Sequence, residues 1–142
     1  MARRKVTQAE IEAAAAAPLK YFSHDAHLAD STACRRFIRR CGPDGYGRYM
    51  RLLERLATEE GHVIDLLDTE SQYLLADELW FGDDLAALGL FLKNLSECGL
   101  VQMFGDGAIK SPVVDEAALY FGKQRANGCT GGRPRKGGSE NA

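Results

Sequence analysis

Residues 68–110 read DTESQYLLADELWFGDDLAALGLFLKNLSECGLVQMFGDGAIK, and this stretch predicts two helices followed by a β-hairpin. Apolar residues recur at helical spacing in two blocks, 69–80 and 83–98, and a glycine follows the end of each block. Side chains that cap helices well precede both blocks, namely Asp68 or Thr69 and Asp83 or Asp84. The two blocks are therefore expected to form a helix-turn-helix pair.

The residues on either side of this pair extend the order of elements. Upstream, residues 46–61 have the apolar period of a long helix, and residues 62–66 (HVIDL) suit a brief strand. Downstream, the short apolar runs 100–104 and 108–110 flank Gly-Asp-Gly at 105–107, which is typical of a hairpin turn. Helix, strand, helix, helix and hairpin is the order of a winged helix. We therefore expect a mainly α (α+β) fold with a small C-terminal β-hairpin wing and flanking helices.

Three segments are expected along the chain. Residues 1–18 form a peripheral arm, in which Thr7 caps an alanine-rich helix that has little apolar surface for docking. Residues 19–122 form the winged-helix domain. Residues 123–142 are basic and glycine-rich and bury too little to become ordered, so they are expected to be a flexible tail.

Two more helices are expected within the domain. The first spans residues 31–40 and ends before a glycine-rich turn at 42–45, and its cap is Asp30 or Ser31. The last begins at Pro112, whose ring suits the first helical position, and ends before Gly122.

The net charge of −2 hides a segregation of charge along the chain. Between residues 31 and 55 there are seven arginines against two acids, whereas residues 59–84 hold nine acids and no lysine or arginine. In the helix at 31–40 the arginines lie away from the apolar stripe, and a second basic stripe follows in the helix from Tyr46. The seven are Arg35, Arg36, Arg39, Arg40, Arg48, Arg51 and Arg55.

Composition argues against several classes of protein. No apolar run approaches the ~20 residues of a membrane span, and no apolar signal-peptide core follows the basic start. A soluble, cytoplasmic protein without a membrane partner is expected. The cysteines at 34, 41, 98 and 129 form no Cys-x-x-Cys pair, so neither a zinc ribbon nor a disulfide scaffold is expected. A metal site of His24, His27 and one or two cysteines is an alternative that matches no common spacing. No cofactor is expected.

Several motifs resemble one known family. They are YFSHDA at 21–26 with Asp30 soon after, CGPDGYGRYMRLLERL at 41–56, LLADEL at 74–79 and LSECGLV at 95–101. Together they resemble the N-terminal domain of phage and prophage replisome-organiser proteins, and the resemblance spans residues 19–122.

This resemblance implies a winged-helix fold and a role in phage or prophage DNA replication inside a bacterial host cell. The role would be origin binding or recruitment of replication proteins of the helicase-loader type. A basic glycine-rich segment like residues 127–136 commonly follows the domain in this family. The sequence ends there, without the C-terminal module of longer relatives, so autonomous initiator activity is not expected.

DNA is the expected partner. The helix at 83–98 would enter the major groove, but it offers few amide or basic side chains beside three acids, so it reads bases poorly. The seven arginines suit phosphates better, because a guanidinium binds them bidentately. The wing tip at 105–107 is expected to touch the DNA backbone, and the tail sequence GGRPRK resembles the core of minor-groove AT-hooks. Beyond the seven arginines, the predicted contacts are Lys93, Asn94, Lys110, Arg133, Arg135 and Lys136.

Other interpretations stay open. The arginines could be solvated, or could pair with the acidic residues of 59–84 within one chain or between two. The fold would then serve as a protein–protein adaptor or a homo-oligomerisation module without direct DNA readout. An enzyme is not expected, because the His24-Asp25 pair has no partner nucleophile. Gly45 and Gly47 suggest close backbone packing at a helix start and not a nucleotide loop.

Overall fold

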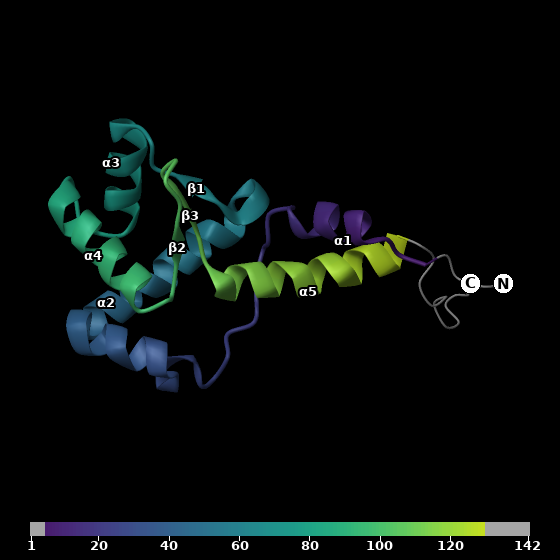
Figure 1. Ribbon diagram of the computed structural model, residues 1–142, viewed down its shortest axis with the longest axis horizontal. Helices are drawn as coiled ribbons and strands as arrows, with labels where there is room; N and C mark the ends of the chain where they lie inside the picture. Colours follow the sequence, from purple (N-terminus) through teal and green to yellow (C-terminus); the bar gives the residue numbers. More distant parts are fainter. Residues whose placement is uncertain (1–4, 130–142) are drawn as a thin grey trace.

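The computed structural model describes residues 5–129 as a mainly helical protein with a small three-stranded antiparallel sheet (Figure 1). From α2 onward the order of elements agrees with the prediction. The two separate helices within residues 68–98 and the hairpin within residues 100–110 are both confirmed. The elements are α1 (Gln8–Ala15), α2 (Thr32–Thr58), β1 (Ile64–Asp65), α3 (Thr69–Glu78), α4 (Leu85–Glu97), β2 (Gln102–Met103), β3 (Ala108–Lys110) and α5 (Pro112–Cys129).

Polar side chains set the starts of four helices. Thr7 caps α1 in a reciprocal capping box. Ser31, Asp68 and Asp84 each accept a hydrogen bond from the backbone N–H three residues on, at 3.2, 2.7 and 3.0 Å. Each cap satisfies an N–H group that has no partner inside its helix, so these starts are determined locally.

The predicted break between two helices is confirmed at Gly42, but it is shorter than the predicted turn from Gly42 to Gly45, because the helix resumes at once and α2 continues with a kink. Gly42 is left-handed (φ 73°), a conformation that glycine adopts without strain. Pro43 then opens the second half of the helix, where its fixed φ is favourable. Gly45 is buried, and a Cβ there would overlap that of Cys41. Close packing is thus confirmed at Gly45, whereas Gly47 has open space around it.

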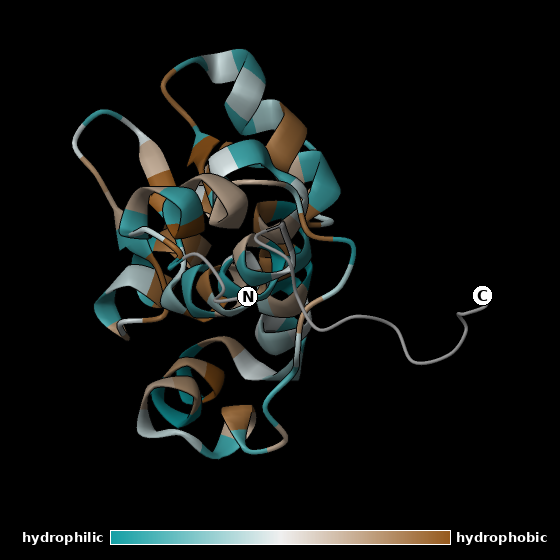
Figure 2. Cartoon of the chain, turned by 90° about the vertical axis from the view of Figure 1, so that its right-hand side faces the viewer, coloured by the Kyte–Doolittle hydropathy of each residue, from teal (hydrophilic) through white to brown (hydrophobic). Residues whose placement is uncertain are grey.

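One hydrophobic core lies between α2, α4, the sheet and the start of α5. The ring of Phe37 in α2 meets Tyr49 edge-on at 6.0 Å between centroids and Phe91 of α4 at 5.7 Å. Ile109 and Val114 are fully buried from the side of the sheet and α5. Hydrophobic and hydrophilic residues lie side by side along the same helices in Figure 2, as expected of elements with one buried face. Within residues 5–129, no helix combines the length and apolar character needed to cross a membrane.

The sheet has the order β1-β3-β2, so its central strand comes last in the sequence. Ile109 of β3 lies opposite Ile64 of β1 and Met103 of β2. The strand predicted at residues 62–66 is reduced to two residues, because His62 is left-handed (φ 55°) and Val63 only leads into the strand.

Helices α1 and α5 lie side by side at one end of the molecule (Figure 1). No residue of α1 is buried. The prediction that the last helix ends before Gly122 is wrong, because α5 continues to Cys129. The reason is tertiary: Gly122 faces Ala15 so closely that a Cβ would overlap it, so this glycine permits contact between two helices. Residues 123–129, predicted as flexible tail, are helical, and the rest of that tail lies outside the described residues.

Candidate nucleic-acid interface

The first half of α2, residues 32–41, presents three arginines to solvent. Phe37 faces the core, and Arg35, Arg36 and Arg39 are exposed on the outer side of the helix. None of the three side chains makes a hydrogen bond or an ion pair with another residue of the described range 5–129. We call these three residues the arginine face.

Arg40 joins this half of α2 to α4. Its guanidinium donates to the carboxylate of Glu97 (2.8 Å) and to the side-chain oxygen of Asn94 (3.2 Å). Asn94 itself donates to the carbonyl of Leu90 (3.1 Å). Arg40 and Asn94 are both predicted nucleic-acid contacts, and the structure brings them together, but each is engaged inside the protein.

The predicted second basic stripe is not a solvated face, because Arg48 fastens α2 to the end of α3. Arg48 donates to the carbonyl oxygens of Leu79 (2.9 Å) and Trp80 (3.3 Å), which the end of the helix leaves without partners. Its guanidinium also lies 4.4 Å from the centroid of the Phe81 ring. Arg48 therefore has a structural role.

Arg55 makes the second fastening between α2 and α3. It pairs with Glu78 of α3 (2.6 Å) and with Glu59 (2.7 Å). Burial acts to lower the pKa of Arg55, but the hydrogen bonds that it donates to both carboxylates, together with their negative charges, outweigh burial, so its pKa is raised. Both acids belong to the segment 59–84, so Arg55 adopts the predicted alternative of pairing within one chain.

The remaining predicted cations are partly engaged or lie elsewhere. Arg51 pairs with Glu54 (3.3 Å). Lys110 donates to the carbonyl of Gly61 (3.1 Å) and pairs with Asp115 (3.2 Å). The predicted tail contacts fall outside the described residues, and they are Arg133, Arg135 and Lys136.

Helix α4 offers few groups that could read DNA bases. Lys93 is exposed and is the only lysine or arginine of the helix. Its exposed neighbours at helical spacing are Ala86, Gly89, Leu90 and Glu97, of which only Glu97 is polar, and that side chain is acidic and bound by Arg40. Direct base readout needs hydrogen-bonding side chains at these positions, so this face can do little beyond meeting a phosphate through Lys93.

The tip of the hairpin, residues 105–107, carries no cationic side chain. Asp106 lies at its centre and accepts a hydrogen bond from the backbone of Ala108 (3.1 Å). The exposed side chains nearby are Met103 and Phe104, which are apolar. The predicted contact of residues 105–107 with the DNA backbone therefore has no cationic side chain to support it.

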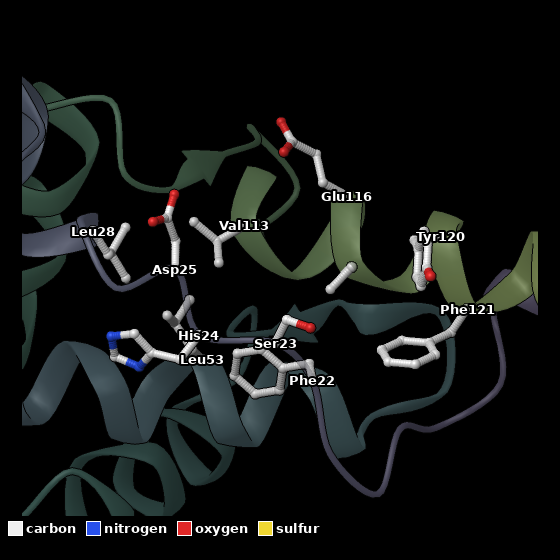
Figure 3. A pocket seen from close by; sticks show the side chains of 11 residues that line it. Phe22, Ser23, His24, Asp25, Leu28, Leu53, Val113, Glu116, Tyr120 and Phe121 are labelled. Carbon is white, nitrogen blue, oxygen red and sulfur yellow. The ribbon is translucent and has the colours of Figure 1, made fainter.

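Sequence reasoning missed a pocket of about 330 Å³ between the motif at 21–26 and α5 (Figure 3). The ring of Tyr21 meets Phe121 edge-on at 5.9 Å beside it. The only sequence signal for this pocket was the pair of aromatic residues Tyr21 and Phe22 in an otherwise polar segment. Its other wall, α5, follows almost ninety residues later, so no local pattern connects the two walls. The polar residues labelled in its lining are Ser23, His24, Asp25, Glu116 and Tyr120. None of the hydroxyl groups among them is hydrogen-bonded to a side chain of residues 5–129 that could act as its base.

The residues proposed for a metal site are not gathered. Within residues 5–129, no group of three or more His, Cys, Asp or Glu side chains is arranged to hold a metal ion. Cys34, Cys41 and Cys98 are free thiols, and burial raises the pKa of Cys34 and of Cys41. His24 and His27 are both exposed.

Comparison with known proteins places the chain in a family. Searches among curated proteins and among solved structures find no match. A family model described as "Lin1244/Lin1753-like, N-terminal" matches residues 21–104, which is more than half of the chain. The matched segment runs from Tyr21, beside the pocket, to Phe104 in the hairpin. The chain therefore belongs to the Lin1244/Lin1753-like N-terminal family.

Proposed function

We propose that this chain is a non-enzymatic, winged-helix DNA-binding domain that acts in phage or prophage DNA replication, in the cytoplasm of a bacterial host. The arginine face carries the proposal. Its three guanidinium groups are exposed and have no partner among the described residues, while the other four arginines of α2 are engaged. Guanidinium groups left free in this way are available to phosphates.

The arrangement of elements supports the winged-helix assignment. Helices α3 and α4 are joined by a short turn, and the β2–β3 hairpin follows them directly. In helix-turn-helix folds the second helix of the pair approaches the major groove. Arg40 links the first half of α2 to the end of α4, so the helix that carries the arginine face contacts the helix that carries Lys93.

Binding through these residues would be driven by phosphates and would discriminate little between sequences. The exposed side of α4 lacks the amide and guanidinium groups that read base edges. Counterion release would then supply most of the affinity, and the affinity would fall steeply with salt.

The replication context rests on the motifs at 21–26 and 41–56, which resemble those of replisome-organiser domains. The same resemblance supports replication proteins of the helicase-loader type as partners. Membership of the Lin1244/Lin1753-like family is compatible with this proposal and does not itself name the process.

The proposal is tested by an electrophoretic shift assay with duplexes of unrelated sequence at about 50 mM salt, where phosphate contacts are strong. We expect a shift with every duplex and its reversal by added salt. The triple variant Arg35→Gln, Arg36→Gln, Arg39→Gln should bind far more weakly. A wild-type protein that shifts no duplex, even at low salt, would remove DNA binding from consideration.

A second function, that of a protein–protein adaptor, is favoured by apolar side chains exposed on α3, α4 and the turn between them. Leu74, Trp80 and Leu90 are each more than 60% exposed. Trp80 is also left-handed (φ 66°), and a bulky residue held in that conformation costs about 1–3 kcal/mol. Such costs are found most often at functional positions.

Gel filtration of the wild type and of a Leu74→Ser, Leu90→Ser variant tests the adaptor function. The adaptor function is favoured if the wild type is an oligomer that binds no DNA and the variant is a monomer. A monomer that binds DNA equally well with and without these leucines would exclude self-association through this surface.

A further inference from the structure

His62 occupies an unusual position where two helices end. Its side chain is buried, with 3% of the residue exposed. Gly61 and His62 both have a left-handed backbone, with φ values of 74° and 55° respectively. The end of α1 at Ala15 and the end of α2 at Thr58 lie on either side of it. Helix C-termini carry partial negative charge on their unpaired carbonyl groups.

Both ring nitrogens of His62 face backbone carbonyl oxygens. Nδ1 lies 3.1 Å from the oxygen of Leu56 in α2, and Nε2 lies 2.8 Å from the oxygen of Ala15 in α1. A carbonyl oxygen only accepts hydrogen bonds, and a neutral imidazole carries a single N–H. Both contacts are hydrogen bonds only when the ring is protonated, because the imidazolium alone has two N–H donors.

We propose that His62 is a proton-dependent clasp, in which the imidazolium holds α1 against the end of α2 and loss of the proton releases α1. The neutral ring would keep one hydrogen bond and place a lone pair against the other carbonyl oxygen. Contact with one of the two helices would then be repulsive. The doubly protonated ring therefore holds α1 more firmly than the neutral ring does.

The charged groups around His62 allow a positive ring. Glu12 of α1, Lys110 of β3 and Asp115 of α5 line the same groove beside it. The ammonium group of Lys110 lies 3.2 Å from the carboxylate of Asp115, which offsets its charge. The segment before His62 contributes the exposed acid Glu60, and on α2 the charge of Arg55 is matched by the two carboxylates that bind it.

Other contacts also hold α1 in place: it packs along α5, where Ala15 lies against Gly122. Gly61 donates its backbone N–H to the carbonyl of Ala16 (2.7 Å), and Arg125 makes a long contact with the carbonyl of Ala14 (3.4 Å). No side chain of α1 is buried, and an isolated helix of this length does not persist in water. Release of the clasp should therefore loosen α1 and expose the face of α5 around Gly122 more often.

Two measurements on the full chain test the clasp. Long-range ¹H–¹⁵N spectra of the histidine rings report whether one or both nitrogens carry protons. Hydrogen exchange of the α1 amides, corrected for intrinsic exchange rates, reports docking. Exchange is compared at about pH 5 and about pH 8, which bracket the usual range of histidine titration. The variants are His62→Gln, which does not titrate, and His27→Gln as a control, because His27 is exposed on another segment.

We expect both ring nitrogens of His62 to be protonated while α1 is protected. Corrected exchange of α1 should rise about ten- to hundredfold at the higher pH, as for loss of a charge-assisted hydrogen bond. This rise should disappear in His62→Gln and persist in His27→Gln. The proposal is overturned if His62 shows a single N–H while α1 is protected. This measurement is made on the unmodified protein, so it does not depend on whether His62→Gln folds. It is also overturned if His62→Gln keeps the full pH dependence.

Discussion

Neutralising the arginine face should change the salt dependence of DNA binding by a calculable amount. The perturbation is the triple variant Arg35→Gln, Arg36→Gln, Arg39→Gln. All three side chains are exposed and have no partner among the described residues, so their loss should change stability by no more than about 0.5 kcal/mol. Any larger effect on DNA binding would then arise from the lost contacts.

The magnitude follows from counterion release. Each phosphate contact adds about 0.9 to the negative slope of log K against log salt for duplex DNA. If each arginine makes one contact, the slope of the variant should be shallower by about 2.7. Between 50 and 200 mM salt, the ratio of wild-type to variant affinity should therefore shrink by about 40-fold. This difference does not depend on how much the basic residues after 129 contribute, because both proteins retain them.

The assay is fluorescence anisotropy with a labelled duplex at four or more salt concentrations. A charge-matched control is Lys5→Gln, Lys20→Gln, Lys123→Gln, which removes the same number of exposed positive charges from other parts of the protein. The control should keep a slope closer to the wild type than the arginine-face variant does. Equal slopes for wild type and arginine-face variant would refute the reasoning, and equal losses in both variants would show an effect of net charge only.

Three further predictions concern stability, each measured by urea denaturation. Gly45→Ala should destabilise the protein by about 1–3 kcal/mol, because the new Cβ would overlap Cys41, whereas Gly47→Ala, a helical site with open space, should stabilise it by about 0.5–1 kcal/mol; similar values for both would contradict the packing described at the kink. Tyr49→Phe should leave stability unchanged or raise it by up to about 1 kcal/mol, because the buried hydroxyl makes no hydrogen bond of good geometry within residues 5–129. A clear loss would show that the nearby hydroxyl of Ser111 is its partner. The backbone N–H of Ser71 lowers the pKa of Asp68, so its carboxylate contributes stability above the unfolded pKa and loses it as pH falls through the folded pKa. The stabilities of Asp68→Asn and wild type should therefore converge as the pH drops below about 4, and a gap that stays constant would disprove this linkage.

Local sequence signals predicted most of the fold because the elements that they describe are determined locally. Asp68 and Asp84 begin α3 and α4 through hydrogen bonds to residues three positions away. The hairpin turn at 105–107 likewise depends on its own residues. Periodicity and capping operate over such distances, so a single sequence contains the necessary information.

One error arose where a distant contact decided the local structure. Gly122 has the usual property of a helix end, but it lies within α5 because Ala15, more than a hundred residues earlier, packs against it. No local pattern reports that contact. The other error has a local cause: Gly42 marks a break correctly, but Pro43 restarts the helix at once, so the break is shorter than the predicted turn.

The candidate site was predicted in composition and not in arrangement. All seven arginines of residues 31–55 were identified as a basic region, yet only the arginine face is left without partners among the described residues. Arg48 and Arg55 reach groups on α3 that lie 31 and 23 positions away. Helical spacing shows that two side chains share a face, but it does not show what lies opposite that face.

The place of β3 in the middle of the sheet has a consequence for the synthesis and dissection of this protein. Ile64 cannot find its partner until Ile109, 45 positions later, has left the ribosome. β1 and β2 do not pair with each other, so a fragment cut at residue 104, where the family match ends, would lose both strand ladders at once. The smallest piece able to fold by itself must therefore extend past the matched segment, at least through Lys110.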